Sequence, residues 1–204
     1  MEGLTAQQSL RLPAAWQGQL QAYALPVPVL EATPQAQRDT ARRSLHHAIV
    51  HTLADALHCD ASSLSVQRRA GQAPILCRDG QALPGLHLSL AYGDALAVWA
   101  WSLQHALGVD VQAIPVGGDD AEWLALAQLY LVPTIAANLA GFQGSALRLA
   151  FAEQWAQLEA QLKCAGLPLV EAHARAADWN AGMQCAVLPA ASHRAAVALA
   201  WRAR

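Results

Sequence analysis

The stretch that organises this chain is FAEQWAQLEAQLKCAG, residues 151–166. It ends a region of about 134–165 whose pattern predicts helix, with a break near residues 141–144 (GFQG). Glu159 and Lys163 are four residues apart, so they share one face of the predicted helix. On spacing alone, the favoured interpretation is an exposed salt bridge, which contributes only about 0.2–0.5 kcal/mol.

Lys163 is the only lysine among the 13 basic residues of the chain, and all the others are arginines. The abundance of Ala, Arg and Leu indicates a coding bias that replaces lysine wherever arginine serves. A lysine retained against that bias indicates a role that needs an ammonium group, because ammonium and guanidinium differ in hydration and proton chemistry. Chance is the alternative, and the residue alone does not separate the two.

Two shorter stretches lie upstream of this helix. GVDVQ at residues 108–112 is a predicted strand in which Asp110 interrupts apolar neighbours, and a buried carboxylate needs a partner or a metal ion. LHLSLA at residues 86–91 begins a predicted hairpin that turns at residues 92–94 and returns through residues 96–101.

The rest of the chain alternates between helical and strand patterns. A strand is expected over residues 19–30, where Pro26 and Pro28 favour an edge position, followed by an amphipathic helix over 34–57. Short strands are expected at 64–66 and 74–76, a helix beginning at Asp119-Asp120, and strands at 167–171, 182–188 and 195–201. The order of strand, helix and strands occurs twice. We therefore expect an α+β fold of two similar half-domains related by a pseudo-twofold axis, residues 1–105 and 106–204, each a small antiparallel sheet packed against a long helix.

Composition excludes several classes of protein. The 204 residues are 54% hydrophobic and 14% charged, which excludes intrinsic disorder, and the net charge of −2 argues against a general nucleic-acid binder. The four cysteines form no CxxC pair, so free thiols in a reducing compartment are expected. The N-terminal MEGL lacks the pattern of a signal peptide, and the apolar stretches are too short to span a bilayer. We expect a soluble, cytoplasmic protein with no membrane partner.

The three stretches, in this order, resemble motifs of the 4′-phosphopantetheinyl transferases of the two-half, surfactin-synthetase-activating type. Those motifs read approximately FNLSHS, G[VI]D[VI]E and FxxxW[TS]xKE[AS]xxKxxG. Arg42-Arg43 at a helix start and GQAP at residues 71–74, where the family has a GKP turn, also fit. The resemblance covers roughly residues 35–200. It implies two α+β halves with CoA and Mg²⁺ bound in the cleft between them, in a monomer.

The implied reaction moves the phosphopantetheine arm of CoA to a serine of an apo acyl or peptidyl carrier protein and releases adenosine 3′,5′-bisphosphate. Such carriers serve fatty acid or polyketide biosynthesis. Asp110 and Glu159 match the magnesium-ligand positions, with Gln112 as a weak third ligand. Glu159 also matches a residue that helps to remove the serine proton. Lys163 matches the residue that contacts phosphate and stabilises the leaving group.

The resemblance places Arg43, Arg69, Ser89 and Lys163 at CoA-binding positions. Three positions depart from the family pattern. Leu90 stands where the family has a histidine that contacts CoA phosphates, Gln112 replaces the second acid of the strand motif, and Leu158 replaces the lysine before Glu159. These departures leave two alternatives: an active transferase with a divergent site, or a non-catalytic module that binds a carrier protein or CoA.

Overall fold

The computed structural model describes residues 7–27, 33–69, 71–93, 95–189 and 194–203 as a mixed α+β fold. Four helices are present in this part of the chain: α1 Pro34–Leu57, α2 Asp120–Tyr130, α3 Pro133–Leu139 and α4 Gly144–Ala165. Its strands are β1 Gln8–Ser9, β2 Gln21–Pro26, β3 Leu64–Gln67, β4 Ile75–Arg78, β5 Gln81–Ala82, β6 His87–Tyr92, β7 Leu96–Ser102, β8 Ala106–Ala113, β9 Met183–Leu188 and β10 Ala195–Arg202. Short 3₁₀ turns occur at Ala14–Trp16, Ala61–Ser63 and Ala172–Ala174.

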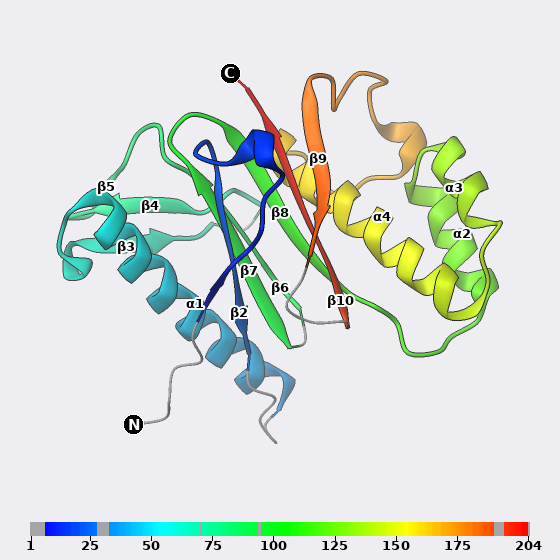
Figure 1. The fold of residues 1–204 in the computed structure, drawn as a ribbon, viewed down its shortest axis with the longest axis horizontal. Coiled ribbons are helices and arrows are strands. Elements are labelled where there is room, and N and C mark those ends of the chain that lie inside the picture. The colour runs from blue at the N-terminus through cyan, green and yellow to red at the C-terminus, as the bar shows by residue number, and fades with distance from the viewer. Residues whose placement is uncertain (1–6, 28–32, 70, 94, 190–193, 204) are drawn as a thin grey trace.

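The strands form three antiparallel sheets with the orders β1-β2-β7-β6, β8-β10-β9 and β3-β4-β5. In Figure 1, the two larger sheets lie side by side in the middle of the molecule, with α1 on one side and α4 on the other. The expected α+β class, with small antiparallel sheets packed against helices, is confirmed. The equivalence of the two halves about a pseudo-twofold axis stays a prediction.

Helix α1 has the predicted bounds and covers the sheet of the N-terminal half. Thr33 caps the helix, with its hydroxyl accepting the Ala36 N–H at 3.3 Å. Leu45 and Leu53 on the buried face of α1 pack in one core with Trp99 of β7, and all three are 0% exposed. The N-terminal half is therefore held by an apolar helix face on an apolar strand, as the helical periodicity predicts.

Helix α4 packs against β8 and β10 through small side chains. A shared core cluster contains alanines from α4 and from β10, which are Ala152, Ala156, Ala160, Ala196, Ala198 and Ala200. Alanine on both surfaces lets the helix backbone approach the sheet closely. This close approach positions the functional side chains described below.

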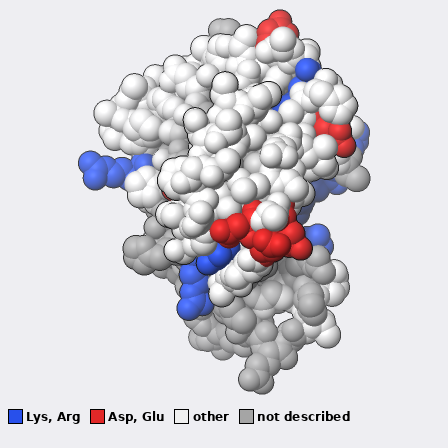
Figure 2. All heavy atoms as spheres, turned by 90° about the vertical axis from the view of Figure 1, so that its right-hand side faces the viewer, with Lys and Arg blue, Asp and Glu red and all other residues white. Residues whose placement is uncertain are grey.

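Helices α2 and α3 lie outside α4, at the right of Figure 1. Asp119 caps α2 as predicted, with its carboxylate accepting the Ala121 N–H at 2.9 Å. The predicted break of the long helical region falls between α3 and α4, where Gly144 has a φ of 56° and its N–H donates to Asp120 at 2.7 Å. Figure 2 shows that the described part of this face is mainly uncharged, with one acidic cluster near the middle and further acidic groups at the top and the upper right.

Two sequence-based expectations are wrong. Residues 167–171 do not form a strand: Gly166 ends α4 in a left-handed conformation, and β9 already occupies the strand position beside β10. Leu167 and Leu169 are accordingly exposed, at 42% and 44%. The strand expected over 19–30 ends at Pro26 and is not an edge strand, because the two residues of β1 pair with its outer side; residues 28–32 lie outside the described part of the chain.

The expected free thiols are confirmed, since all four cysteines are unpaired. Within the described residues, no helix combines the length and the apolar character needed to cross a membrane.

Candidate functional site

The site is built where α4 crosses β8, and Gly108 makes the crossing close. A Cβ atom added at Gly108 would lie 2.1 Å from the Ala160 carbonyl oxygen and 2.5 Å from the Cys164 nitrogen, whereas such contacts are essentially never shorter than 3.0 Å. Only glycine therefore allows this contact between strand and helix. Asp110 follows Gly108 by two positions on β8. The close crossing therefore places Asp110 next to residues of α4.

Asp110 is the charged residue that β8 contributes to this crossing, and it is only 4% exposed. Its Oδ1 accepts a hydrogen bond of 2.7 Å from Nζ of Lys163, which also donates to the Val109 carbonyl at 3.2 Å. Burial raises the pKa of the Asp110 carboxyl from 3.8 to about 6, the Lys163 ammonium opposes this rise, and the charge of Glu159 adds to it. The strand thus contributes a buried acid whose partner, Lys163, comes from the helix.

Glu159 lies one helical turn before Lys163 and is half-buried. Its Oε1 accepts a hydrogen bond of 2.8 Å from the indole N–H of Trp155. The effect of Glu159 on the pKa of Asp110 indicates that the two carboxylates are electrostatic neighbours. The structure therefore brings Asp110 and Lys163 into direct contact, and Glu159, one turn earlier on the same helix face, interacts electrostatically with Asp110.

A magnesium ion at this crossing would depend on two carboxylates, those of Asp110 and Glu159, the first of which is paired with Lys163 in the structure. Mg²⁺ prefers oxygen ligands, is usually bound by one or two carboxylates, and fills its remaining positions with water and substrate phosphates. Among the described residues, no group of three or more His, Cys, Asp and Glu side chains is arranged to hold a metal. Asp110 and Glu159 would hold the ion, and a phosphorylated substrate would supply further oxygens.

Gln112 lies on the same side of β8 as Asp110, two residues further on. Its side chain is half-buried, and its amide N–H donates to the Ala113 carbonyl at 3.3 Å. An amide oxygen is a neutral ligand, so a metal held here takes its negative charge from Asp110 and Glu159.

Ser89, predicted to bind CoA, is buried between the two larger sheets. It is 5% exposed, and its hydroxyl oxygen accepts the Val109 N–H at 3.0 Å. The bond joins β6 to β8, next to Asp110. Ser89 is not among the residues that line the cavity described next.

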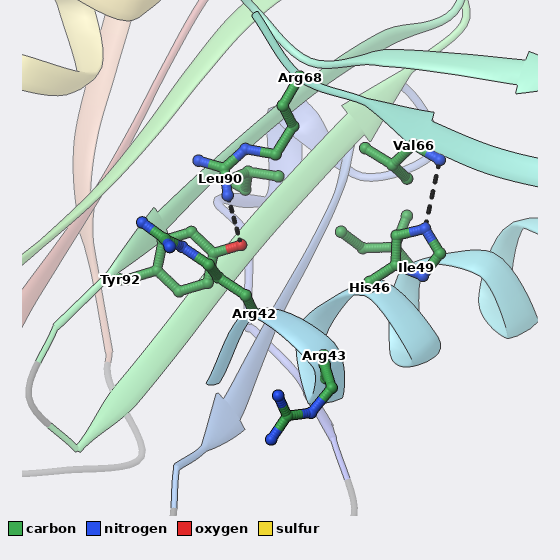
Figure 3. A pocket seen from close by; sticks show the side chains of 8 residues that line it. All are labelled: Arg42, Arg43, His46, Ile49, Val66, Arg68, Leu90 and Tyr92. Carbon is green, nitrogen blue, oxygen red and sulfur yellow. Dashed lines mark hydrogen bonds between the residues drawn. The ribbon is translucent and has the colours of Figure 1, made fainter. Parts of the chain in front are cut away.

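A cavity of about 310 Å³ opens between α1, β3 and β6 (Figure 3). Its lining combines basic and apolar side chains, which are Arg42, Arg43, His46, Ile49, Val66, Arg68, Leu90 and Tyr92. Arg68 donates to the Tyr92 hydroxyl at 3.1 Å and lies over the Tyr92 ring at 5.2 Å. Figure 3 shows Arg42 and Arg68 directed toward Tyr92, with Arg43 further out along α1. The guanidinium of Arg43 points away from Tyr92 and donates to the Thr40 hydroxyl at 3.1 Å, and Arg42 also pairs with Asp39 at 3.2 Å. The cavity therefore has two guanidinium groups at Tyr92, those of Arg42 and Arg68, and such groups can bind an anion.

Of the two arginines predicted to bind CoA, Arg43 is among the lining residues of this cavity and Arg69 is not, whereas the neighbouring Arg68 is. Successive side chains of an extended segment point to opposite sides, so Arg68 shares its side with Val66. This alternation was a signal in the sequence for choosing Arg68. Arg69 is exposed, and its carbonyl oxygen accepts the Gln72 N–H in the following turn.

Tyr92 is a further cavity residue that sequence reasoning missed. It lies two positions after Leu90 on β6 and therefore on the same side of the strand. Burial raises the pKa of the Tyr92 hydroxyl, while the charges of Arg68 and Arg42 lower it. Arg42 and Arg68 thus both lie near Tyr92 in the cavity.

A second cavity, of about 340 Å³, lies between the end of α4 and the strands of the N-terminal half. Its lining includes Pro74, His87, Lys163 and Gly166. Lys163 therefore connects Asp110 with a cavity to which both halves contribute.

The departures from the family pattern have different structural outcomes. Leu90 lines the arginine cavity, so an apolar side chain stands where the resemblance expects a cation. Leu158 is 5% exposed and belongs to the core that α4 forms with α2 and α3, away from the alanine face that meets β8 and β10. Comparison of the sequence with protein-family models and with curated proteins finds no match.

Proposed function

We propose that this protein is a magnesium-dependent 4′-phosphopantetheinyl transferase that modifies an apo acyl or peptidyl carrier protein in the cytoplasm and acts as a monomer. The observation that carries the proposal is the meeting of Asp110, Glu159 and Lys163 where α4 crosses β8. Two carboxylates and one ammonium supply the charges that a displacement at phosphorus requires.

In this reaction the carrier serine oxygen attacks the phosphorus next to the pantetheine arm. A new P–O bond forms, the diphosphate P–O bond breaks, and adenosine 3′,5′-bisphosphate leaves. Mg²⁺ bound by Asp110 and Glu159 would neutralise phosphate charge and orient the diphosphate. Glu159 accepts the serine proton, directly or through a water molecule. Lys163 stabilises the leaving phosphate and can donate a proton to it, which an arginine effectively cannot.

The arginine cavity supports CoA as the substrate, because CoA carries both a diphosphate and a 3′-phosphate. Arg42 and Arg68 present guanidinium groups to it, and guanidinium binds phosphate oxygens in pairs. The net charge of −2 argues against nucleic acid as the macromolecular partner.

A non-catalytic role is the second candidate, and Leu90 is the observation that favours it. The side chain in the arginine cavity that would contact a phosphate in the family is apolar here. A module of this kind would bind CoA or a carrier protein without transferring the phosphopantetheine arm.

Intact-mass measurement separates the two candidates. Purified protein is incubated with Mg²⁺, CoA and a panel of apo acyl and peptidyl carrier proteins. We expect one phosphopantetheine mass increment on a carrier, abolished by Glu159→Gln and by Lys163→Ala. Glu153→Gln is the matched control, since Glu153 lies on α4 and is half-buried but outside the site. Carrier or CoA binding with no increment would favour the non-catalytic module, and an increment that survives both site substitutions would contradict the assigned roles.

A further inference from the structure

The hydrogen bond between Trp155 and Glu159 gives the indole a role beyond packing. The indole N–H donates to Glu159 Oε1 at 2.8 Å, and both side chains are half-buried on the same face of α4. A hydrogen bond to a carboxylate is charge-assisted and stronger than a neutral one. A flexible glutamate side chain is thereby restricted at one oxygen.

Two other aromatic rings contact the indole of Trp155. Phe151, one turn earlier on α4, stacks on Trp155 with ring centroids 5.4 Å apart and an interplanar angle of 28°. Tyr130, the last residue of α2, meets the indole edge-on at 5.4 Å and 72°. Two such contacts fix the plane of the indole and therefore the direction of its N–H bond. The Trp155 indole thus packs in the core between α4 and α2 and donates its N–H to Glu159 in a fixed direction.

Lys163 does not replace this donor. Although Lys163 is four residues after Glu159, its ammonium donates to Asp110 and to the Val109 carbonyl. Among the described residues, Trp155 is thus the hydrogen-bond donor that the structure shows for Glu159. The charges of Asp110 and Glu159 repel each other, and the Trp155 N–H offsets negative charge at Oε1 of Glu159.

We propose that Trp155 is a positioning residue for Glu159, which with Asp110 would bind the divalent cation. The Trp155 N–H holds Oε1 of Glu159, so that Oε2 is presented to the cation together with the Asp110 carboxylate. This inference rests on the magnesium site of the proposed function. Hydrogen-bond partners of metal ligands typically affect metal affinity or activity by about 10–100-fold.

A pair of tryptophan substitutions provides the test. Trp155→Phe keeps an aromatic ring and removes the N–H. Trp123→Phe is the matched control: Trp123 contacts the same Phe151 at 5.3 Å, but its buried N–H has no hydrogen-bond partner among the residues that the structure describes. Trp155→Gln restores a donor, because its amide N–H is as many bonds from the backbone as the indole N–H. Binding of Mn²⁺ alone, as a probe of the magnesium site, is followed by electron paramagnetic resonance of the free ion, alongside urea unfolding and the Mg²⁺ dependence of carrier modification.

We expect Trp155→Phe to raise the dissociation constant for Mn²⁺ at least tenfold, Trp155→Gln to recover part of the loss, and Trp123→Phe to stay within twofold of the unsubstituted protein. Equal affinities for the two Phe variants would overturn the positioning role, as would a stability loss that accounts for the change by unfolding. No Mn²⁺ binding by the unsubstituted protein would also overturn it. Loss of Mn²⁺ binding in Trp155→Phe, in a protein that modifies no carrier, would instead support the positioning role and reject the transferase function.

Discussion

The buried carboxyl of Asp110 makes the stability of this protein depend on pH in a defined direction. Its pKa is about 6 in the folded chain, against 3.8 for the free side chain, chiefly because of burial. The folded state therefore binds the proton more tightly than the unfolded state does. The stabilisation from this proton is fully present below about pH 4 and is lost as the pH rises through 6.

The expected magnitude follows from the difference between the two pKa values. About two pH units, at about 1.4 kcal/mol each, correspond to about 3 kcal/mol. Asp110→Asn removes the titrating group. Between pH 4 and pH 7 the unfolding free energy of the natural chain should therefore fall by about 3 kcal/mol relative to that of the variant. Urea unfolding with EDTA present, across a series of pH values, measures both curves.

Asp178→Asn, which changes an exposed carboxylate, is the control and should leave the pH profile close to that of the natural chain. Parallel profiles for the natural chain and Asp110→Asn would refute the reasoning, and so would a gain in the relative stability of the natural chain with rising pH. The same assay at pH 7.5 tests the metal. A Mg²⁺ concentration ten times the dissociation constant should stabilise the natural chain by about 1.4 kcal/mol and leave Asp110→Asn unaffected.

Three further substitutions test the geometry around the site. Gly108→Ala should reduce the unfolding free energy by about 3 kcal/mol in urea unfolding, because the new Cβ would lie 2.1 Å from a carbonyl oxygen of α4; unchanged stability would contradict the close crossing. Ser89→Ala should cost about 1–3 kcal/mol in the same assay, because the Val109 N–H loses its partner, and a loss of CoA affinity without any loss of stability would show instead that Ser89 contacts the ligand. Arg68→Glu should weaken CoA binding at least tenfold by calorimetry, whereas Arg69→Glu, outside the cavity, should change it little; equal effects would argue against the cavity as the phosphate-binding region.

Local sequence patterns were sufficient for most of the secondary structure. Periodicity predicts the helix at 34–57, turn residues predict the hairpin from 86 to 102, and capping preferences predict the Asp119 cap. All three signals act between residues that are close in the chain. The same reasoning failed for residues 167–171, where an apolar stretch resembles a strand but finds no free strand position beside β10. Strand formation depends on a partner, and the partner is chosen by the whole fold.

In the candidate site, too, some features follow from the sequence and others depend on the tertiary structure. The motif resemblance selects Asp110, Glu159 and Lys163 from sequence, and helical spacing places two of them on one face. The ion pair between Lys163 and Asp110 joins residues 53 positions apart, and its formation depends on how closely α4 packs on β8 at Gly108. The choice of Arg68 over Arg69 and the burial of Ser89 likewise depend on which side of a strand meets a neighbouring element. Short-range preferences determine the elements, whereas packing between distant segments determines which side chains meet and how their charges are shielded from water.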